Sequence, residues 1–204
     1  MFKKKPEIIK KEETEERKYK IWIISTLFFS ISAFIMFATI TIYIDPLFHY
    51  HKPLEKYKYP INNERYQNDG ITKNFEYESI ITGTSMTENF KKSEADKIFG
   101  SDFIKVPFAG GHYKEINDNL KRAYNSGKNI KYIIRCLDYS HLVEGKDTYR
   151  EDIEYPFYLY NSNLFDDVNY VLNKSILFEQ TLGVIKHTKN CSWEYQTKCN
   201  KPGW

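Results

Sequence analysis

The sequence predicts an α/β domain with a parallel sheet, joined to one amino-terminal transmembrane helix. An uncharged apolar run over residues 21–44 is long enough to cross a bilayer. Between residues 76 and 141, three short apolar runs alternate with two segments of helical spacing. This alternation, with short loops, is typical of a parallel sheet with right-handed crossovers and helices on both faces. We therefore expect a three-layer α/β/α domain.

Composition excludes some classes of protein. The 204 residues, 41% hydrophobic and 28% charged, suit one globular domain with an appendage and exclude a wholly disordered chain. The net charge of +3 is too small to indicate a nucleic-acid partner. We expect neither a nucleic-acid partner nor a cofactor.

The three cysteines do not suggest a metal site. Cys136 lies inside an apolar run and is most simply a buried thiol. Cys191 and Cys199 lie in a polar tail and are close enough in sequence for a local disulfide, if that tail is outside the cytoplasm. Their spacing lacks the pattern of a zinc site.

The apolar run over residues 21–44 has the length and ends of a membrane anchor. As a helix it would be about 36 Å long, enough for a hydrocarbon core of about 30 Å with some tilt. Trp22 and Tyr43 lie near its two ends, where amphipathic rings prefer the headgroup region. A cleaved signal peptide fits less well, because the run ends in Tyr-Ile-Asp-Pro rather than in small residues. A buried core helix would show a polar face.

Basic residues predict the orientation of this anchor. Residues 1–20 form a basic tail, containing Lys3, Lys4, Lys5, Lys10, Lys11, Arg17, Lys18 and Lys20. Between residues 45 and 60 the only basic residues are Lys52, Lys56 and Lys58. The positive-inside rule therefore predicts a single-pass protein of the cell membrane, with its amino terminus cytoplasmic and residues 76–204 outside.

Residues 45–75 are expected to form an irregular juxtamembrane lead-in to the domain. Pro46 and Pro53 disfavour continuation of the helix, and the segment is polar. His49 and His51 alternate with aromatic residues. A metal pair would need a third ligand, so we interpret both histidines as interfacial packing residues.

Five elements are expected in the domain. They are a strand ending at Gly83, a helix over 93–100, a strand over 103–106, a helix over 112–124 and a strand over 130–137. The third strand is apolar enough to be central in the sheet. Residues 145–163, with their charged and aromatic side chains, resemble an insertion or lid. Residues 164–186 follow helical spacing and predict one amphipathic helix, broken near Gly183. Three strands are few for a doubly wound domain, so the carboxyl-terminal part of such a domain is expected to be missing.

Residues suited to catalysis follow the strands. Ser85, Gly110, Gly111 and Asp138 each come just after a strand, and the carboxyl ends of parallel strands gather active groups at one edge. A strand, a sharp turn and a helix at Ser85 would place its hydroxyl beside free backbone N–H groups, as a serine nucleophile requires. The alternative is an ordinary turn in which Thr84 and Ser85 cap the helix.

These blocks carry a resemblance to a known superfamily. Gly83-Thr84-Ser85-Met86, Gly110-Gly111 and Leu137-Asp138-Tyr139 resemble successive blocks of the SGNH (GDSL-like) hydrolases, which have a flavodoxin-like α/β/α fold. With one amino-terminal span, the chain is most similar to the membrane-anchored branch, which includes the D-alanyl-lipoteichoic acid biosynthesis protein and the alginate O-acetylation proteins. That branch performs acyl-ester chemistry on envelope glycans outside the membrane.

The resemblance implies roles for individual residues. Ser85 would be the nucleophile, and the backbone N–H groups of Ser85 and of Gly110 or Gly111 would form the oxyanion hole. Asp138-Tyr139-Ser140-His141 matches the Asp-x-x-His motif that supplies the catalytic Asp138 and His141, but it follows the third strand instead of the last one. Asp138 also falls where the superfamily usually has Asn. His112 and His187 are weaker candidates for the base.

Two functions of different classes follow. The first is an acyl-ester hydrolase or O-acyltransferase acting on a cell-envelope polymer through Ser85, provided that a base is supplied. The alternative is a non-catalytic envelope protein that binds glycan or a membrane acyltransferase partner, with the aromatic segment 149–160 as a stacking surface. A purely structural role for the sheet is a third interpretation. In each case residues 21–44 would contact the lipid bilayer.

Overall fold

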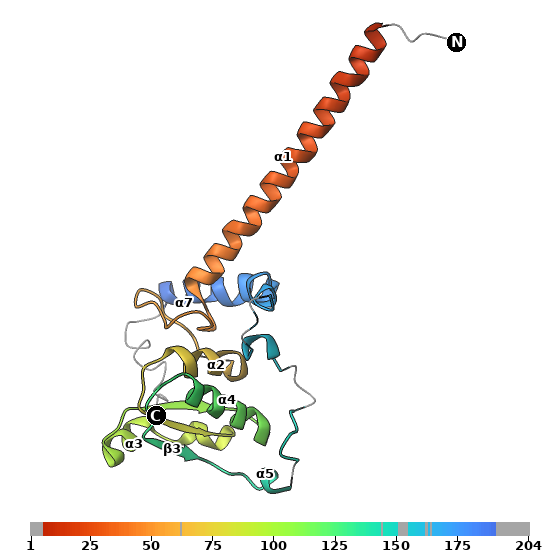
Figure 1. Cartoon of the computed structure of the whole chain (residues 1–204). Coiled ribbons are helices and arrows are strands. Elements are labelled where there is room, and N and C mark those ends of the chain that lie inside the picture. The colour runs from red at the N-terminus through yellow and green to blue at the C-terminus, as the bar shows by residue number, and fades with distance from the viewer. Residues whose placement is uncertain are drawn as a thin grey trace. The chain divides into compact units, whose positions relative to one another are not determined.

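A computed structural model describes residues 6–61, 63–143, 145–150, 155–161, 163 and 165–190 (Figure 1). The chain divides into two compact units, Met1–Ile40 and Thr41–Trp204. The first unit consists of most of helix α1 (Pro6–Ile44), and the second is a mixed α/β domain with a small parallel sheet. The predicted cysteine pair, Cys191 and Cys199, lies outside the described residues, whereas Cys136 is a half-buried free thiol.

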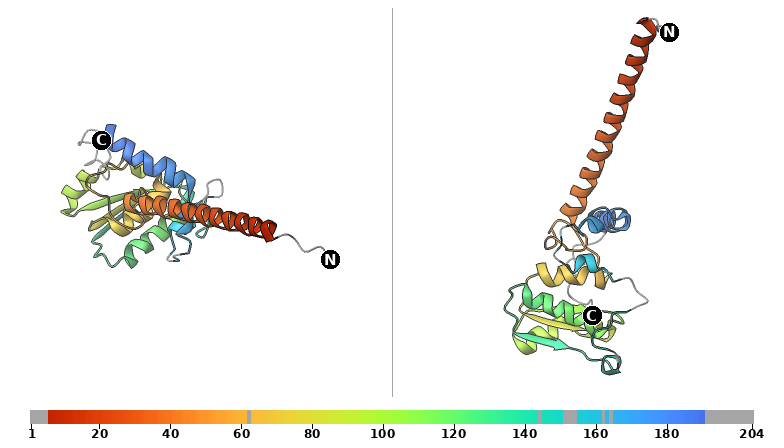
Figure 2. Two further views of the ribbon diagram at one scale, coloured as in Figure 1. Left: turned by 90° about the horizontal axis from the view of Figure 1, so that it is seen from above. Right: turned by 45° about the vertical axis from the view of Figure 1, so that its right-hand side comes forward.

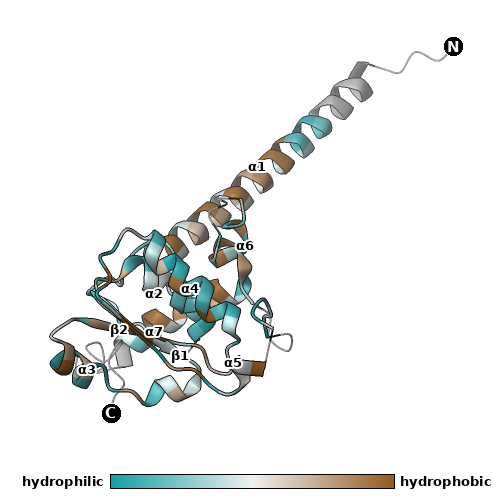
Figure 3. Cartoon of the chain, turned by 60° about the horizontal axis from the view of Figure 1, so that its bottom comes forward, coloured by the Kyte–Doolittle hydropathy of each residue, from teal (hydrophilic) through white to brown (hydrophobic). Residues whose placement is uncertain are grey.

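Helix α1 contains a segment, Thr14–Ile44, that is long and apolar enough to cross a membrane. Figure 3 shows most of this segment in the brown of hydrophobic residues. The hydroxyl groups of Thr26, Ser30 and Thr39 donate to the carbonyl oxygen four residues earlier, at 2.7–2.9 Å. These bonds satisfy polar groups that would otherwise be costly in hydrocarbon. A helix of sufficient length and hydropathy is thus confirmed, and its insertion in a membrane and its orientation stay predictions.

A buried carboxylate turns the chain sharply after α1. Asp45 is fully buried with a φ of 48°. Its two oxygens accept the backbone N–H groups of His49, Tyr50 and His51 at 2.8–2.9 Å, and Oδ1 also accepts the Tyr170 hydroxyl at 2.6 Å. The carboxylate thus satisfies the backbone N–H groups of the turn that follows the helix.

The expectation of an irregular lead-in is wrong over helix α2 (Glu64–Asn74). This helix lies beside α4 (Tyr113–Asn125) in Figures 1 and 2. Its buried residues are mostly polar: Arg65, Gln67, Asn68, Asp69, Gly70, Ile71 and Thr72. Asn68 donates to the Pro107 carbonyl, and Thr72 donates to Asn119 Oδ1 at 3.0 Å. Hydrogen bonds thus replace the apolar stripe that usually indicates a packed helix.

The sheet is parallel, as predicted, but its strand order differs from the expectation. Strands β1 (Ser79–Gly83), β2 (Phe103–Pro107) and β3 (Tyr132–Arg135) are arranged in the order β2-β1-β3. The fully buried central strand is therefore β1. The apolar run at β3 was expected to be central, yet β3 pairs on one side only within the described structure and is half-exposed.

The faces of the sheet pack against different helices. Ile80, Ile104 and Val106 share a cluster with Ile71 of α2 and Ala123 of α4. On the other face, Ile81 and Phe103 pack with Ala95 of α3 (Lys92–Phe99). The alternation along β1 from Ile80 to Ile81 follows from the two-residue period of a strand.

The two helices predicted within residues 93–124 are confirmed with small differences at their ends. Helix α3 ends at Gly100, whose φ of 60° suits a left-handed C-cap. Helix α4 begins after His112, where Glu115 and the His112 backbone form a capping box. Both caps are local signals that can be recognised in the sequence.

The carboxyl-terminal part contains several short helices. After α5 (Ser140–Val143) and η2 (Phe157–Leu159) come α6 (Val168–Val171), the π-helix η3 (Ser175–Thr181) and α7 (Leu182–Asn190). The single helix expected over 164–186 is thus interrupted, and the break falls at 172–174 rather than at Gly183. Asn173 Oδ1 accepts the Ser175 N–H at 2.9 Å, which favours a new helix start there.

Candidate functional site

The turn after β1 is built around Gly83. A Cβ atom there would lie 2.2 Å from Thr87 Oγ1 and 2.7 Å from Cys136 Cβ, so the position has no room for a side chain. The chain continues through an extended Thr84 into the 3₁₀ helix η1 (Ser85–Asn89). Ser85 is the first residue of η1 and is exposed. It therefore lies just after the carboxyl end of β1, as expected.

The turn after β2 packs against the turn after β1. The Phe108 N–H donates to the Gly83 carbonyl at 2.8 Å. Gly110 has a φ of 56°, and the Gly111 N–H donates to the Phe108 carbonyl at 2.7 Å. Of the two predicted oxyanion donors in this turn, Gly111 is thus already engaged. The exposed Gly110 has no backbone hydrogen bond within the described part of the chain.

Two side-chain hydrogen bonds join the segment after β3 to the other turns. The Thr84 hydroxyl donates to the Asp138 carboxylate. The Nε2 atom of His141, a residue that is 7% exposed, lies 3.0 Å from the Gly111 carbonyl oxygen. Segments that follow three different strands therefore meet at one edge of the sheet.

The predicted catalytic residues share this edge without forming a hydrogen-bonded triad. Asp138 and His141 contact each other through the His141 N–H and the Asp138 carbonyl, at 3.0 Å. Because a carbonyl can only accept, His141 Nε2 carries the proton. The Ser85 hydroxyl makes no hydrogen bond to any residue that the structure describes. The catalytic roles of these three residues stay predictions.

The other histidines have separate environments. His112 Nδ1 lies 3.3 Å from the Thr148 hydroxyl, and His187 is in α7. His49 Nε2 is 3.1 Å from Asp167 Oδ1, while the His51 ring contacts the carbonyl oxygens of Lys52 and Ile42. No cluster of three His, Cys, Asp or Glu residues that could hold a metal ion occurs among the described residues.

A pair of carboxyl groups borders the same edge and was not predicted. Glu64 Oε2 accepts the Ala109 N–H at 2.6 Å, and the Glu64 side chain is hydrogen-bonded to Glu88. Burial, followed by the charge of Glu88, raises the pKa of Glu64 from 4.5 to about 7. Glu64 can therefore keep its proton up to about neutral pH and donate a hydrogen bond to Glu88. No motif in the sequence links Glu64 to Glu88, so the pair emerges only from the fold.

Two guanidinium groups contact the turn after β2. Arg65 Nε donates to Glu115 Oε2 at 2.7 Å, and its Nη2 donates to the Ala109 carbonyl at 3.0 Å. Arg150 Nη1 donates to the same carbonyl at 3.4 Å. A Cβ atom at Gly110 would lie only 2.2 Å from this Nη1 atom, so a larger residue would displace the guanidinium. Gly110 thus allows a cation to approach the backbone beside its N–H group. An anion near Gly110 would be stabilised by this arrangement.

No family model, curated protein or solved structure matches this chain. The function is therefore argued from the geometry of the site.

Proposed function

We propose that the protein is a membrane-anchored, SGNH-like enzyme that hydrolyses or transfers acyl esters of a cell-envelope polymer through Ser85. The meeting of three strand-end segments carries this proposal: Thr84 is bonded to Asp138, His141 is bonded to Gly111, and Ser85 is exposed beside them. A complete three-layer α/β/α arrangement belongs to the proposal, as does an extracytoplasmic location of the domain.

The proposed chemistry proceeds through an acyl-enzyme. Ser85 Oγ attacks the ester carbonyl carbon and loses its proton to His141, whose Nδ1 atom is buried and has no hydrogen-bond partner in the described structure. The N–H groups of Ser85 and Gly110 stabilise the oxyanion, with the Arg150 guanidinium nearby. The leaving alkoxide takes the proton, and water or an acceptor hydroxyl then releases the acyl group.

One observation favours the alternative, a non-catalytic protein that binds glycan or an acyltransferase partner. Within the described residues the Ser85 hydroxyl has no bonded base, and the Asp138 carboxylate is held by Thr84. A serine without a positioned base is a poor nucleophile. Catalytic contacts do, however, often tighten only when substrate binds, so a chemical test is needed.

Labelling with a fluorophosphonate separates these two functions. The full chain in non-ionic detergent should react, and Ser85→Ala should abolish labelling. Ser93→Ala is the matched control, because Ser93 is also exposed and lies in α3. His141→Ala should slow labelling on the order of a hundredfold, the usual contribution of a general base. Equal labelling of wild type and Ser85→Ala, or none of the folded wild type, would reject the enzyme.

Orientation needs a separate experiment. A carboxyl-terminal tag on the full chain should be cleaved by protease added to intact spheroplasts, because the basic tail predicts a cytoplasmic amino terminus. A tag at the amino terminus should be protected. The reverse pattern would reject the extracytoplasmic location.

A further inference from the structure

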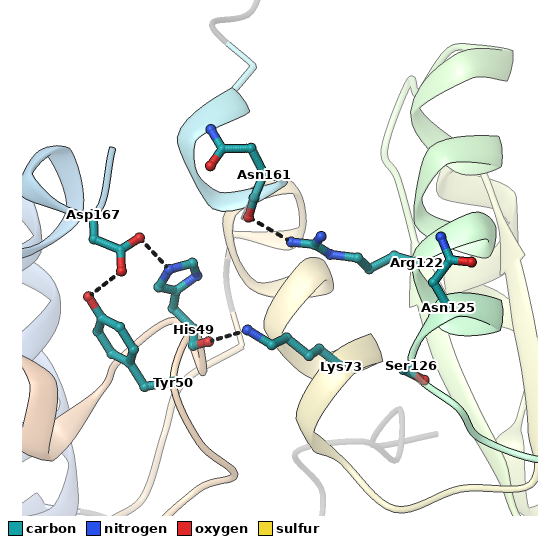
Figure 4. Close-up of a pocket in the computed structure, with 8 residues that line it drawn as sticks. All are labelled: His49, Tyr50, Lys73, Arg122, Asn125, Ser126, Asn161 and Asp167. Carbon is teal, nitrogen blue, oxygen red and sulfur yellow. Dashed lines mark hydrogen bonds and ion pairs between the residues drawn. The ribbon is translucent and has the colours of Figure 1, made fainter. Parts of the chain in front are cut away.

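A polar pocket of about 460 Å³ lies in the α/β unit, away from the Ser85 edge. It is lined by His49, Tyr50, Lys73, Arg122, Asn125, Ser126, Asn161 and Asp167 (Figure 4). Helix α4 begins beside Gly111, whereas Arg122 and Asn125 lie in its last turn. At 1.5 Å per residue the two ends of this helix are about 18 Å apart. The pocket is therefore a separate site from the edge of the sheet that contains Ser85.

Three side chains in the pocket have unused hydrogen-bond donors. Lys73 is exposed, and its ammonium group contacts only the His49 carbonyl, at 3.4 Å, within the described residues. Arg122 uses Nε and Nη2 to bind Asp69, at 2.6 and 3.3 Å, and Nη2 also reaches two carbonyl groups. Its Nη1 group has no partner in the part of the chain that is described, and neither does the Asn125 amide. The Arg122 contacts hold the guanidinium in a fixed orientation, which lowers the entropy cost of binding a ligand.

One unused acceptor, a buried ring nitrogen, belongs to a residue that lines the same pocket. His49 is 6% exposed, and its Nε2 atom lies 3.1 Å from Asp167 Oδ1. With the proton on Nε2, Nδ1 is an acceptor, and it has no hydrogen-bond partner among the described residues. Figure 4 shows the ring between Asp167 and Lys73, with Nδ1 on the side away from Asp167. The other Asp167 oxygen accepts the Tyr50 hydroxyl at 3.3 Å, so both oxygens of this carboxylate are engaged.

We propose that this pocket binds a phosphate group with a neighbouring free hydroxyl, as in a polyol phosphate. Lys73, Arg122 and Asn125 would donate to the phosphate oxygens, and the hydroxyl would donate to His49 Nδ1. Lysine as a point charge and arginine as a planar donor both suit phosphate, and three donor side chains, one from α2 and two from α4, match its several oxygens.

This chemistry has two sources, a lipid headgroup and a free polyol phosphate. Tyr50 follows the end of α1 by six residues, which can span at most about 22 Å. Since α1 contains the candidate membrane span, the pocket is within reach of a bilayer surface. The proposal does not depend on the Ser85 chemistry, and Ser85→Ala should bind the same ligand.

Calorimetric titration of the full chain in non-ionic detergent tests the proposal with glycerol 3-phosphate, methyl phosphate and glycerol. Lys73→Gln should weaken glycerol 3-phosphate binding on the order of tenfold or more, because a charged hydrogen bond is lost. Lys97→Gln is the matched control, since Lys97 is also exposed and also lies in the last turn of its helix. It should leave the affinity unchanged.

His49→Phe tests the hydroxyl contact separately. At a pH of about 8 a phosphate monoester has lost its last acidic proton, because its second pKa is about 6. The donor to His49 must then be the hydroxyl. His49→Phe, which keeps a ring beside Tyr50 and Tyr170, should weaken glycerol 3-phosphate on the order of tenfold and leave methyl phosphate unchanged. Equal effects on both ligands would refute the hydroxyl contact.

Nanodiscs distinguish the two sources. If the ligand is a headgroup, wild type and Lys97→Gln should unfold at a higher temperature in phosphatidylglycerol than in phosphatidylcholine. Lys73→Gln should unfold at the same temperature in both lipids. Binding of glycerol 3-phosphate without this lipid effect would identify a free polyol phosphate. The proposal is overturned if folded wild type responds to neither probe, or if Lys73→Gln and Lys97→Gln behave alike in both assays.

Discussion

Replacing Glu64 by Gln should stabilise the folded protein at neutral and alkaline pH. Burial and the neighbouring Glu88 raise the pKa of Glu64 from 4.5 to about 7. Between these values the folded state keeps a proton that the unfolded chain releases, so the free energy of unfolding falls as the pH rises. Gln carries no charge to bury, can accept the Ala109 N–H through its amide oxygen and can donate to Glu88.

The size of this effect follows from the pKa difference. A raise of this size corresponds to at most about 3 kcal/mol. Because Glu64 is only half-buried, solvent screens part of this effect, and we expect about 1–2 kcal/mol. As the pH rises from about 5 to about 8, the free energy of unfolding of wild type should fall by this amount relative to that of Glu64→Gln.

Denaturant unfolding of the detergent-solubilised chain at the two pH values measures this difference. Glu94→Gln is the matched control, since Glu94 is an exposed residue paired with Lys91 at the surface of α3. Its pH profile should parallel that of wild type. Parallel profiles for wild type and Glu64→Gln, or a Glu64→Gln variant that is less stable at the higher pH, would refute the raised pKa of Glu64.

Two further predictions concern stability and are measured by the same denaturant unfolding. Asp45→Ala should lower the free energy of unfolding by about 3 kcal/mol or more, because three backbone N–H groups and the Tyr170 hydroxyl lose their acceptor. Tyr170→Phe removes only one of these donors and should cost less. Equal costs for the two variants would contradict the backbone role of Asp45. Gly70→Ala should destabilise by at least about 2 kcal/mol, because its Cβ would lie 2.3 Å from the Phe48 carbonyl oxygen. Gly183→Ala, in open space within α7, should stabilise by about 0.5–1 kcal/mol, so a similar cost at both glycines would contradict the close approach at Gly70.

Local patterns predicted the three strands and the helices between them, but not the strand order. Strands β1 and β2 and helix α3 could be placed because apolar runs and Gly100 are signals that act over a few residues. The position of β3 at the edge depends on pairing between distant segments. Its apolar residues are half-exposed, and composition alone made this strand look central.

Helix α2 was missed because its buried side chains are polar. Arg65, Asn68 and Asp69 would indicate an exposed segment in a hydropathy pattern, yet each has a specific partner on α4 or near β2. Such partners cannot be inferred from spacing. The location of Ser85 followed from the strand and turn pattern. Its hydrogen-bonding environment, and the partnership of Glu64 with Glu88, depended on three-dimensional packing.

Helices α2 and α4 both extend from the edge of the sheet that contains Ser85 to the polar pocket. Arg65 contacts Glu115 and Asp69 contacts Arg122, so the helices run parallel. Glu64 and His112 place both N-termini beside the turn after β2, where their partial positive charge would favour an oxyanion.

The last turns of these helices contain Lys73 and Arg122, which face the polar pocket. Cations there also compensate the partial negative charge of the helix ends. Lys73→Gln should therefore cost about 0.3–1 kcal/mol of stability. Lys97→Gln removes the equivalent charge from α3 and should cost the same. A loss of phosphate binding confined to Lys73→Gln would then reflect the ligand contact and not the helix dipole.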